Sequence, residues 1–252
     1  MRKNIKIVFL IIKSLILFIV IGALTTASVK NVQKIILVNE FISKGVYQPE
    51  LSTEKEKHYI IYNSDELPSY TINNKEILPG YEGDIIVSTE ATLFNPIISG
   101  VVSFFAGGHA TICMNKYRDY EISVDDYQSV EITGVNMDEN PAINNRNYWV
   151  NQQYFNEVIG LRVKMTKEQR EEIISLATSY IGDPYNYTFL FDTTNKSYCS
   201  DLVSKVFGHI GFDLNKDDFT TSIYDLIVTK ETYISYYHYF DSNGVKHIYY
   251  FG

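Results

Sequence analysis

The chain has 252 residues, with 22 lysine and arginine residues against 30 aspartate and glutamate residues, and its formal net charge is −8. This length suffices for one domain with a sizeable core, and the acidic balance argues against nucleic acid as a partner. Because the chain has only two cysteines, Cys113 and Cys199, it has no disulfide framework.

The first 27 residues have the composition of an export leader. They carry no acidic side chain and four basic ones, namely Arg2, Lys3, Lys6 and Lys13. An uninterrupted apolar stretch at 15–24 is followed by the small residues Thr25, Thr26 and Ala27, after which a signal peptidase could cut. Because the apolar stretch is short, we favour a cleaved signal peptide over residues 1–27.

An uncleaved membrane anchor is the alternative for this leader. Residues 7–12 are also apolar. If the Lys13 side chain reaches the membrane surface, residues 7–29 supply the roughly 20 residues that a transmembrane helix needs. In both cases we expect an extracellular domain, either secreted or anchored to the outer face of the cytoplasmic membrane.

Residues 28–58 are predicted to connect this leader to the domain. An amphipathic helix is expected at 31–43, followed by a charged linker at 50–57. The domain itself then comprises residues 59–252.

Residues 59–252 are predicted to hold several strands, one clear helix and a final hairpin. Alternation predicts strands at 59–62, 84–87, 110–114, 120–124, 129–133 and 158–163. Thr166 and Gln169 form a capping box before a helix at 167–181, which Gly182 ends. The hairpin joins 233–240 to 245–251, and we interpret its many tyrosines as cross-strand pairs rather than a sugar-binding surface.

Cys199 stands at the start of a predicted short amphipathic helix. Four apolar residues fall on one face of this helix, namely Leu202, Val203, Val206 and Phe207, and the polar residues Ser200, Asp201, Ser204 and Lys205 fall on the other. The N–H groups and partial positive charge of a helix start favour thiolate over thiol. The alternative is a cysteine that only fills core space.

His109 opens the predicted strand at 110–114, directly after Gly107 and Gly108. An imidazole that faces a thiol can polarise it and later protonate the leaving group. A histidine at a strand end can also be purely structural. Cys113 shares a strand face with His109; it could neighbour Cys199 and form a disulfide with it, but packing is the favoured interpretation.

The order of these residues, with four flanking motifs, resembles a known family. The motifs lie at 83–87, 180–187, 198–203 and 219–226. Residues 81–227 resemble the circularly permuted papain-like amidases of the YiiX/YaeF type, which are related to NlpC-type cell-wall peptidases and to lecithin retinol acyltransferase. The resemblance implies an α+β fold, in which an antiparallel sheet packs against the helix that carries the cysteine.

The resemblance also implies a cysteine hydrolase of the amidase or peptidase type, with His109 and Cys199 as catalytic residues and no cofactor. The substrate would be a peptidoglycan peptide or an N-acyl compound, cleaved through a thioester. A lipid acyltransferase or esterase and a non-catalytic binding module are the alternatives. The remaining histidines lack metal-ligand spacing, so no metal site is predicted: His58, His209, His238 and His247.

Three further residues are assigned roles. In the family, the third catalytic residue lies on a strand after the histidine strand, where Glu121 and Glu131 both qualify. We favour Glu131, which a glycine follows at 134, because Glu121 stands among charged residues. Tyr185 and Tyr187 are candidate walls of the substrate pocket, with core packing as the alternative.

Overall fold

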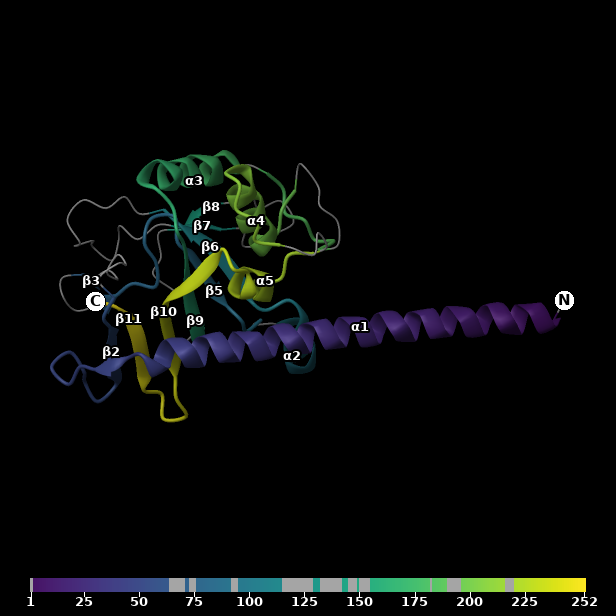
Figure 1. Ribbon diagram of the computed structural model, residues 1–252, viewed down its shortest axis with the longest axis horizontal. Coiled ribbons are helices and arrows are strands. Elements are labelled where there is room, and N and C mark those ends of the chain that lie inside the picture. The colour runs from purple at the N-terminus through teal and green to yellow at the C-terminus, as the bar shows by residue number, and fades with distance from the viewer. Residues whose placement is uncertain are drawn as a thin grey trace.

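A computed structural model gives the structure of the protein (Figure 1). It describes residues 2–63, 71–72, 76–91, 95–114, 129–131, 142–144, 149, 155–181, 183–189, 196–215 and 220–252. The predicted strand at 120–124 lies outside these residues. The described part of the chain contains a long N-terminal helix that runs along a mixed domain and projects far beyond it.

The helices of the described chain are α1 (Arg2–Ser43), α2 (Pro96–Phe105), α3 (Lys167–Ser179), α4 (Cys199–His209) and α5 (Ile223–Val228). The strands are β1 (Val46–Tyr47), β2 (Glu56–Ile61), β3 (Thr71–Ile72), β4 (Glu76–Ile77), β5 (Ile85–Ser88), β6 (His109–Cys113), β7 (Ser129–Glu131), β8 (Ala142–Asn144), β9 (Glu157–Val163), β10 (Thr232–Phe240) and β11 (Lys246–Phe251). Within the described ranges, β3 and β4 pair with each other and the remaining strands form one sheet, in the order β1-β2-β11-β10-β9-β5-β6-β7-β8.

The sheet is antiparallel throughout except at one pair. Only β2 and β11 run parallel among the described strands. Because α4 packs against β6 of this sheet, the structure confirms the predicted α+β class, with an antiparallel sheet against the cysteine helix.

The two faces of the sheet bury separate apolar clusters. On β5, Ile85 and Val87 belong to the larger cluster, which includes residues of α1, α3, α4 and α5, whereas Ile86 belongs to the smaller cluster on the opposite face. This alternation follows from the two-residue period of a strand. Cys199 lies in the larger cluster and Cys113 in the smaller one, so the two thiols are on different faces of the sheet and form no disulfide with each other.

A buried ion-pair network fixes the start of β5 to its neighbours. The Asp84 carboxylate is fully buried; Arg162 of β9 lies 2.8 Å from it, and Arg170 of α3 lies 3.3 Å from it. A buried carboxylate without such partners would cost several kcal/mol. The network therefore holds β5, β9 and α3 in one arrangement. The helix it anchors, α3, begins at the predicted Thr166–Gln169 capping box.

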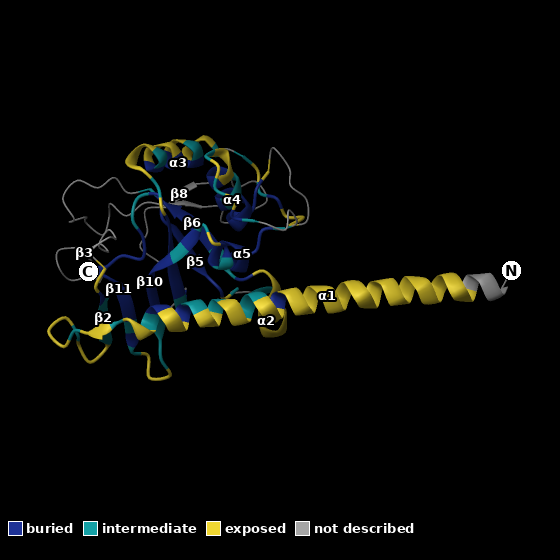
Figure 2. Cartoon of the chain, viewed as in Figure 1, coloured by how far each residue is buried: buried dark blue, intermediate teal, exposed yellow. Residues whose placement is uncertain are grey.

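The N-terminal helix differs from the expectation of a separate helix at 31–43. The structure has one continuous helix, because residues 25–27 contain no glycine or proline that would end it. Its N-terminal part is exposed from Ile7 to Leu24, and Ala27 is the first buried residue (Figure 2). This helix is long and apolar enough to cross a membrane, a test that a signal sequence near the N-terminus also passes.

Other predicted elements differ at their ends. β2 begins at Glu56, inside the predicted charged linker, because it adds to the edge of the hairpin strand β11. The final hairpin is confirmed as β10 and β11. Helices α2 and α5 were not predicted from the sequence.

Gly107, between α2 and β6, has no room for a side chain. Its φ is +85°, a conformation that L-residues rarely adopt, and a Cβ there would lie 2.5 Å from Cβ of Ile223. We expect Gly107→Ala to lower the free energy of unfolding by about 2 kcal/mol or more, as measured by urea denaturation.

Gly208, in the last turn of α4, is the matched control. A Cβ there would meet nothing within 4 Å. Gly208→Ala should therefore leave the stability unchanged or raise it slightly. Equal stability of the two variants would contradict the proposed tight packing of Gly107 on α5.

Candidate active site

Cys199 is the first residue of α4 and lies almost completely below the surface. The preceding residue, Tyr198, has an extended backbone and gives the helix no side-chain cap. The Ser200 N–H donates a hydrogen bond to the sulfur instead. Cys199 as a whole residue has 9% of its surface exposed. Its position at the helix start agrees with the sequence prediction.

The structure brings His109 and Cys199 together. His109 is the first residue of β6, and its side chain is hydrogen-bonded to the Cys199 sulfur. The Ala110 N–H, next to the histidine, donates a second hydrogen bond to the same sulfur. One strand end therefore presents both an imidazole and a backbone donor to the thiol.

The surroundings of Cys199 lower its pKa. Burial of the sulfur is the largest single influence and raises the pKa, since it disfavours the charged form. The hydrogen bond and the positive charge of His109, with the N–H groups of Ala110 and Ser200, oppose burial and together outweigh it. The net pKa is therefore lower than that of an ordinary cysteine, which makes the thiolate available as a nucleophile.

The ring of His109 is stacked on an aromatic column that sequence reasoning missed. The imidazole lies parallel to Trp149, with 5.6 Å between ring centroids and 3° between planes. Trp149 is itself stacked on Phe155 at 4.5 Å and is completely buried. The column holds the imidazole plane in place beside the sulfur. Trp149 is the single tryptophan of the chain, and this was the only sequence signal that could have singled it out.

An aromatic cluster surrounds the other side of Cys199. Tyr185 contacts Tyr187 at 4.6 Å and Phe189 at 5.9 Å between ring centroids, and Phe189 contacts Tyr198 at 5.3 Å. Burial, followed by the nearby charge of a Cys199 thiolate, raises the pKa of Tyr185, so its phenol stays neutral. Tyr185 is thus close to the sulfur, whereas Tyr187 and Phe189 are 37% and 46% exposed.

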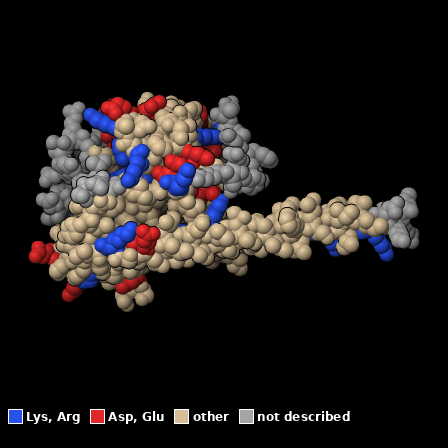
Figure 3. Space-filling view, in the orientation of Figure 1, with Lys and Arg blue, Asp and Glu red and all other residues tan. Residues whose placement is uncertain are grey.

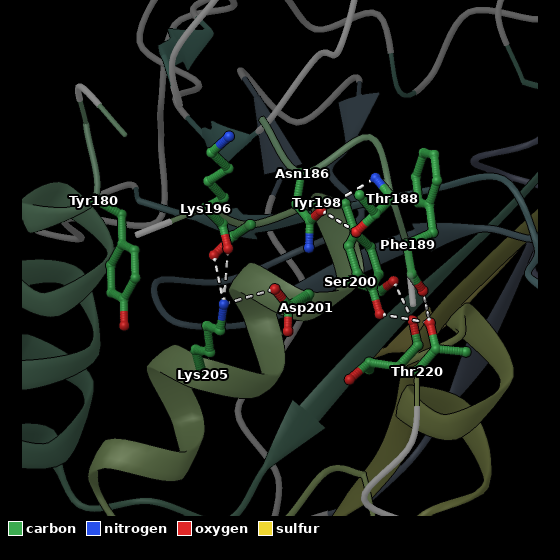
Figure 4. Close-up of polar contacts among 12 residues, drawn as sticks. Tyr180, Asn186, Thr188, Phe189, Lys196, Tyr198, Ser200, Asp201, Lys205 and Thr220 are labelled. Carbon is green, nitrogen blue, oxygen red and sulfur yellow. Dashed lines mark hydrogen bonds and ion pairs between the residues drawn. The ribbon is translucent and has the colours of Figure 1, made fainter. Parts of the chain in front are cut away.

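Backbone contacts hold this aromatic segment against the cysteine segment. Tyr185 forms a parallel bridge with Ser197, and the Asn186 N–H donates to the Ser197 carbonyl at 2.9 Å. Figure 4 shows the Thr220 hydroxyl between Tyr198 and the Phe189 carbonyl, bonded to both. Phe189 has φ of +55°, a conformation that non-glycine residues keep only where their surroundings enforce it.

Two residues of the predicted polar face of α4 are in fact buried. The Ser200 hydroxyl donates to the Thr221 carbonyl at 2.7 Å, and Asp201 pairs with Lys205 at 2.8 Å (Figure 4). Lys205 also donates to the Lys196 carbonyl at 2.9 Å. These contacts join α4 to Lys196, before the helix, and to Thr221, before α5. The helix is therefore held by both segments.

Comparison with known proteins assigns the part of the chain that contains these residues to a family. Residues 81–228, more than half of the chain, match the permuted papain-like amidase enzymes of the YaeF/YiiX type, the C92 peptidase family. The chain belongs to this permuted papain-like amidase family. No curated protein matches it. A similar solved structure is the metalloprotein yiiX of Escherichia coli O157:H7, with 15% sequence identity and a TM-score of 0.46, over 62% of this chain and 96% of that one.

The predicted third catalytic residue, Glu131, lies partly outside the described structure. The backbone of Glu131 is in β7, paired with Thr111 of β6. Thr111 is two residues from His109 on the same strand, so Glu131 occupies a position diagonal to the histidine. Its side chain, like the whole of Glu121, is outside the described residues. Glu131 as the third catalytic residue stays a prediction.

The word metalloprotein belongs to the name of the similar structure. Among the described residues, no three histidine, cysteine, aspartate or glutamate side chains come together in a way that could hold a metal ion. Two of the other histidines make different contacts: His238 is buried against the Tyr236 hydroxyl at 2.8 Å, and His209 lies 3.2 Å from the Tyr180 hydroxyl.

We expect Cys199 to react with iodoacetamide faster than Cys113 at neutral pH. Cys199 has a lowered pKa and partial exposure, whereas Cys113 is completely buried. His109→Ala removes the largest influence that lowers the Cys199 pKa, so the pKa should rise and alkylation at neutral pH should slow by about tenfold or more. Mass spectrometry of the alkylated peptides over a pH series measures both effects.

His209→Ala is the control for this experiment. His209 belongs to the same helix as Cys199 but to its last turn, so its loss should leave the pH profile unchanged. A profile that His109→Ala does not move would show that the two side chains do not interact in solution.

Proposed function

We propose that the protein is an exported cysteine-dependent amidase that cleaves its substrate through a thioester on Cys199. The observation that carries this proposal is the lowered pKa of a cysteine hydrogen-bonded to a histidine at a helix start. The family assignment supports hydrolysis of an amide, and the geometry supports Cys199 as the nucleophile.

The chemical steps follow from the positions of these two side chains. His109 takes the thiol proton of Cys199 and becomes an imidazolium. The Cys199 thiolate attacks the carbonyl carbon of the amide, and the carbonyl oxygen becomes an oxyanion. The backbone N–H of Cys199, at the start of α4, is the expected oxyanion donor, together with a further donor. The imidazolium of His109 then gives its proton to the departing amine, and a thioester remains. Water attacks this thioester with His109 as the base, which releases the acid and restores the thiol.

The proposed substrate is an amide whose acyl part packs on the aromatic cluster. Tyr185 and Tyr187 remain the proposed pocket walls, and Phe189 and Tyr198 extend the same surface. Such a surface accepts apolar or flat groups. A peptide of the cell wall and an N-acyl compound both satisfy this requirement, so both belong in an activity test.

Export is inferred from the N-terminal sequence. The basic residues Arg2, Lys3 and Lys6 precede the apolar stretch, and basic residues favour the cytoplasmic side. The two lysines that follow this stretch most closely are neutralised in ion pairs, Lys30 with Asp225 and Lys34 with Glu157. This asymmetry supports a domain outside the cytoplasm, whether α1 is cleaved or retained.

We expect Cys199→Ala to lower the hydrolysis of peptide and N-acyl amide substrates by about a thousandfold or more, because the variant loses the sulfur that is hydrogen-bonded to His109. Steady-state release of the amine from both substrate classes measures this loss. Cys113→Ala, in the cluster on the opposite sheet face, should retain turnover in the fraction that folds. Full turnover in Cys199→Ala would refute the proposed nucleophile.

We expect Glu131→Gln to lower turnover by about tenfold or more, since the amide would hold the imidazole of His109 less firmly in the required tautomer. Glu121→Gln is the paired variant and should have nearly wild-type turnover. Thermal unfolding of both variants separates catalytic loss from unfolding. The opposite ranking of the two turnover rates would make Glu121 the third catalytic residue.

A further inference from the structure

Helix α2 (Pro96–Phe105) is apolar over its whole length and none of its residues is buried. It contains no charged residue in its sequence PIISGVVSFF. Four large side chains are exposed, namely Ile97 at 78%, Ile98 at 54%, Val101 at 54% and Phe105 at 39%. A contiguous apolar patch of this kind is unfavourable in water and marks a surface that something else covers.

We propose that α1 is retained as a transmembrane helix, the alternative to the favoured cleavage after residue 27, and that α2 lies in the interfacial layer of the same membrane. Two apolar elements would then hold the domain on the bilayer. This proposal concerns a surface outside the catalytic residues and does not depend on the proposed amidase mechanism. Its first support is the place of α2 in the fold. Figures 1 and 2 show α2 beside α1 at the point where α1 leaves the domain and becomes exposed.

A hydrogen bond fixes α2 at this point. The Asn31 side chain of α1 donates to the Phe104 carbonyl of α2 at 3.0 Å. Asn31 lies about one turn after Ala27, the first buried residue of α1. The exposed side chains of α2 therefore continue the exposed apolar surface of α1 rather than forming a separate patch. Figure 3 shows that the visible surface along α1 carries no charged side chain between the domain and the basic residues near its N-terminus.

The length of the exposed part of α1 matches a bilayer. Residues 7–24 are about 27 Å long at 1.5 Å per residue, close to the roughly 30 Å of a hydrocarbon core. If this part spans the bilayer, the membrane surface lies near Leu24, within about two helical turns of Asn31 and its contact with α2. An apolar helix at that depth meets the boundary between headgroups and acyl chains.

The rigid connection between α1 and the domain keeps α2 at this depth. Within the same continuous helix, Lys30 pairs with Asp225 of α5 at 2.5 Å and Lys34 pairs with Glu157 of β9 at 2.6 Å. Both ion pairs are largely buried, so water screens them little. The domain consequently has one orientation relative to α1, and this orientation turns α2 toward the bilayer. A second copy of the chain could also cover α2, but it would leave the adjoining surface of α1 unexplained.

The proposed position of α2 in the membrane interface also connects the candidate active site to the lipid surface, because α2 is followed closely by the strand that begins at His109. One residue, Ala106, separates Phe105 from the glycine pair that precedes His109 at the start of β6. The Ala106 carbonyl accepts a hydrogen bond from the Ile223 N–H of α5 at 2.8 Å, and the Tyr224 hydroxyl donates to the Ser103 carbonyl at 2.7 Å. The proposed lipid-facing helix is thus hydrogen-bonded to α5 and continues through Ala106 toward the strand that begins at His109.

Fluorescence quenching in vesicles tests this proposal. The full-length Ile97→Trp variant is reconstituted in phosphatidylethanolamine and phosphatidylglycerol vesicles, with and without brominated acyl chains, and the wild-type signal of the buried Trp149 is subtracted. The expected result is blue-shifted emission at position 97 and strong quenching by lipids brominated near the headgroup. Ile98→Trp, on the same helix, should give the same result.

Leu51→Trp is the matched control. Leu51 is 47% exposed in the turn before β2, at the end of the domain opposite the projecting part of α1 (Figure 1). Its emission should stay red-shifted and unquenched. Unquenched emission at positions 97 and 98 in these vesicles would overturn the proposal. Blue-shifted but unquenched emission that depends on protein concentration would overturn it in favour of a second copy of the chain.

Discussion

The candidate active site depends on two opposing influences on the pKa of Cys199, namely burial of the thiol and the hydrogen bonds that its sulfur accepts. Burial alone would keep this thiol protonated and inert, and it is the largest influence on its pKa. The contact with His109 and the N–H groups of Ala110 and Ser200 reverse the outcome. A thiolate in a buried place needs these partners held at fixed positions, because a small displacement would leave a charge without compensation.

Several elements far apart in the sequence fix these positions. Gly107 allows α2 to pass closely over Ile223 of α5 before β6 begins at His109. Trp149 keeps the imidazole plane in place from one side, and α4 is held on the other by the contact of Ser200 with Thr221. The same α5 is joined to α1 through the ion pair of Asp225 with Lys30. The helix that is long and apolar enough to cross a membrane and the proposed catalytic pair, His109 and Cys199, therefore belong to one connected framework, which is why we link the proposed chemistry to a lipid surface.

The sequence predicted those features that local physics determines. A capping box at Thr166, alternation along β5 and a cysteine before an apolar stripe each depend on neighbouring residues, and each appears in the structure. Features that depend on distant contacts were missed. Trp149 stacks on a histidine 40 positions earlier in the chain. Helix α2 has no polar face that would mark it as a surface helix. Ser200 is a polar residue expected at the surface, but its hydroxyl is buried in a hydrogen bond to the Thr221 carbonyl. The approach of His109 to Cys199 was inferred from a family resemblance, because no local pattern could bring the two together.

The central claim is that this framework makes Cys199 a nucleophile toward acyl compounds. Mass spectrometry of the full-length protein after treatment with an electrophilic amide or ester probe tests it most directly. The account predicts one covalent adduct, located on Cys199, that is lost in Cys199→Ala and strongly reduced in His109→Ala. A protein that stays unmodified at Cys199, or one in which His109→Ala is labelled as fast as the wild type, would contradict the account.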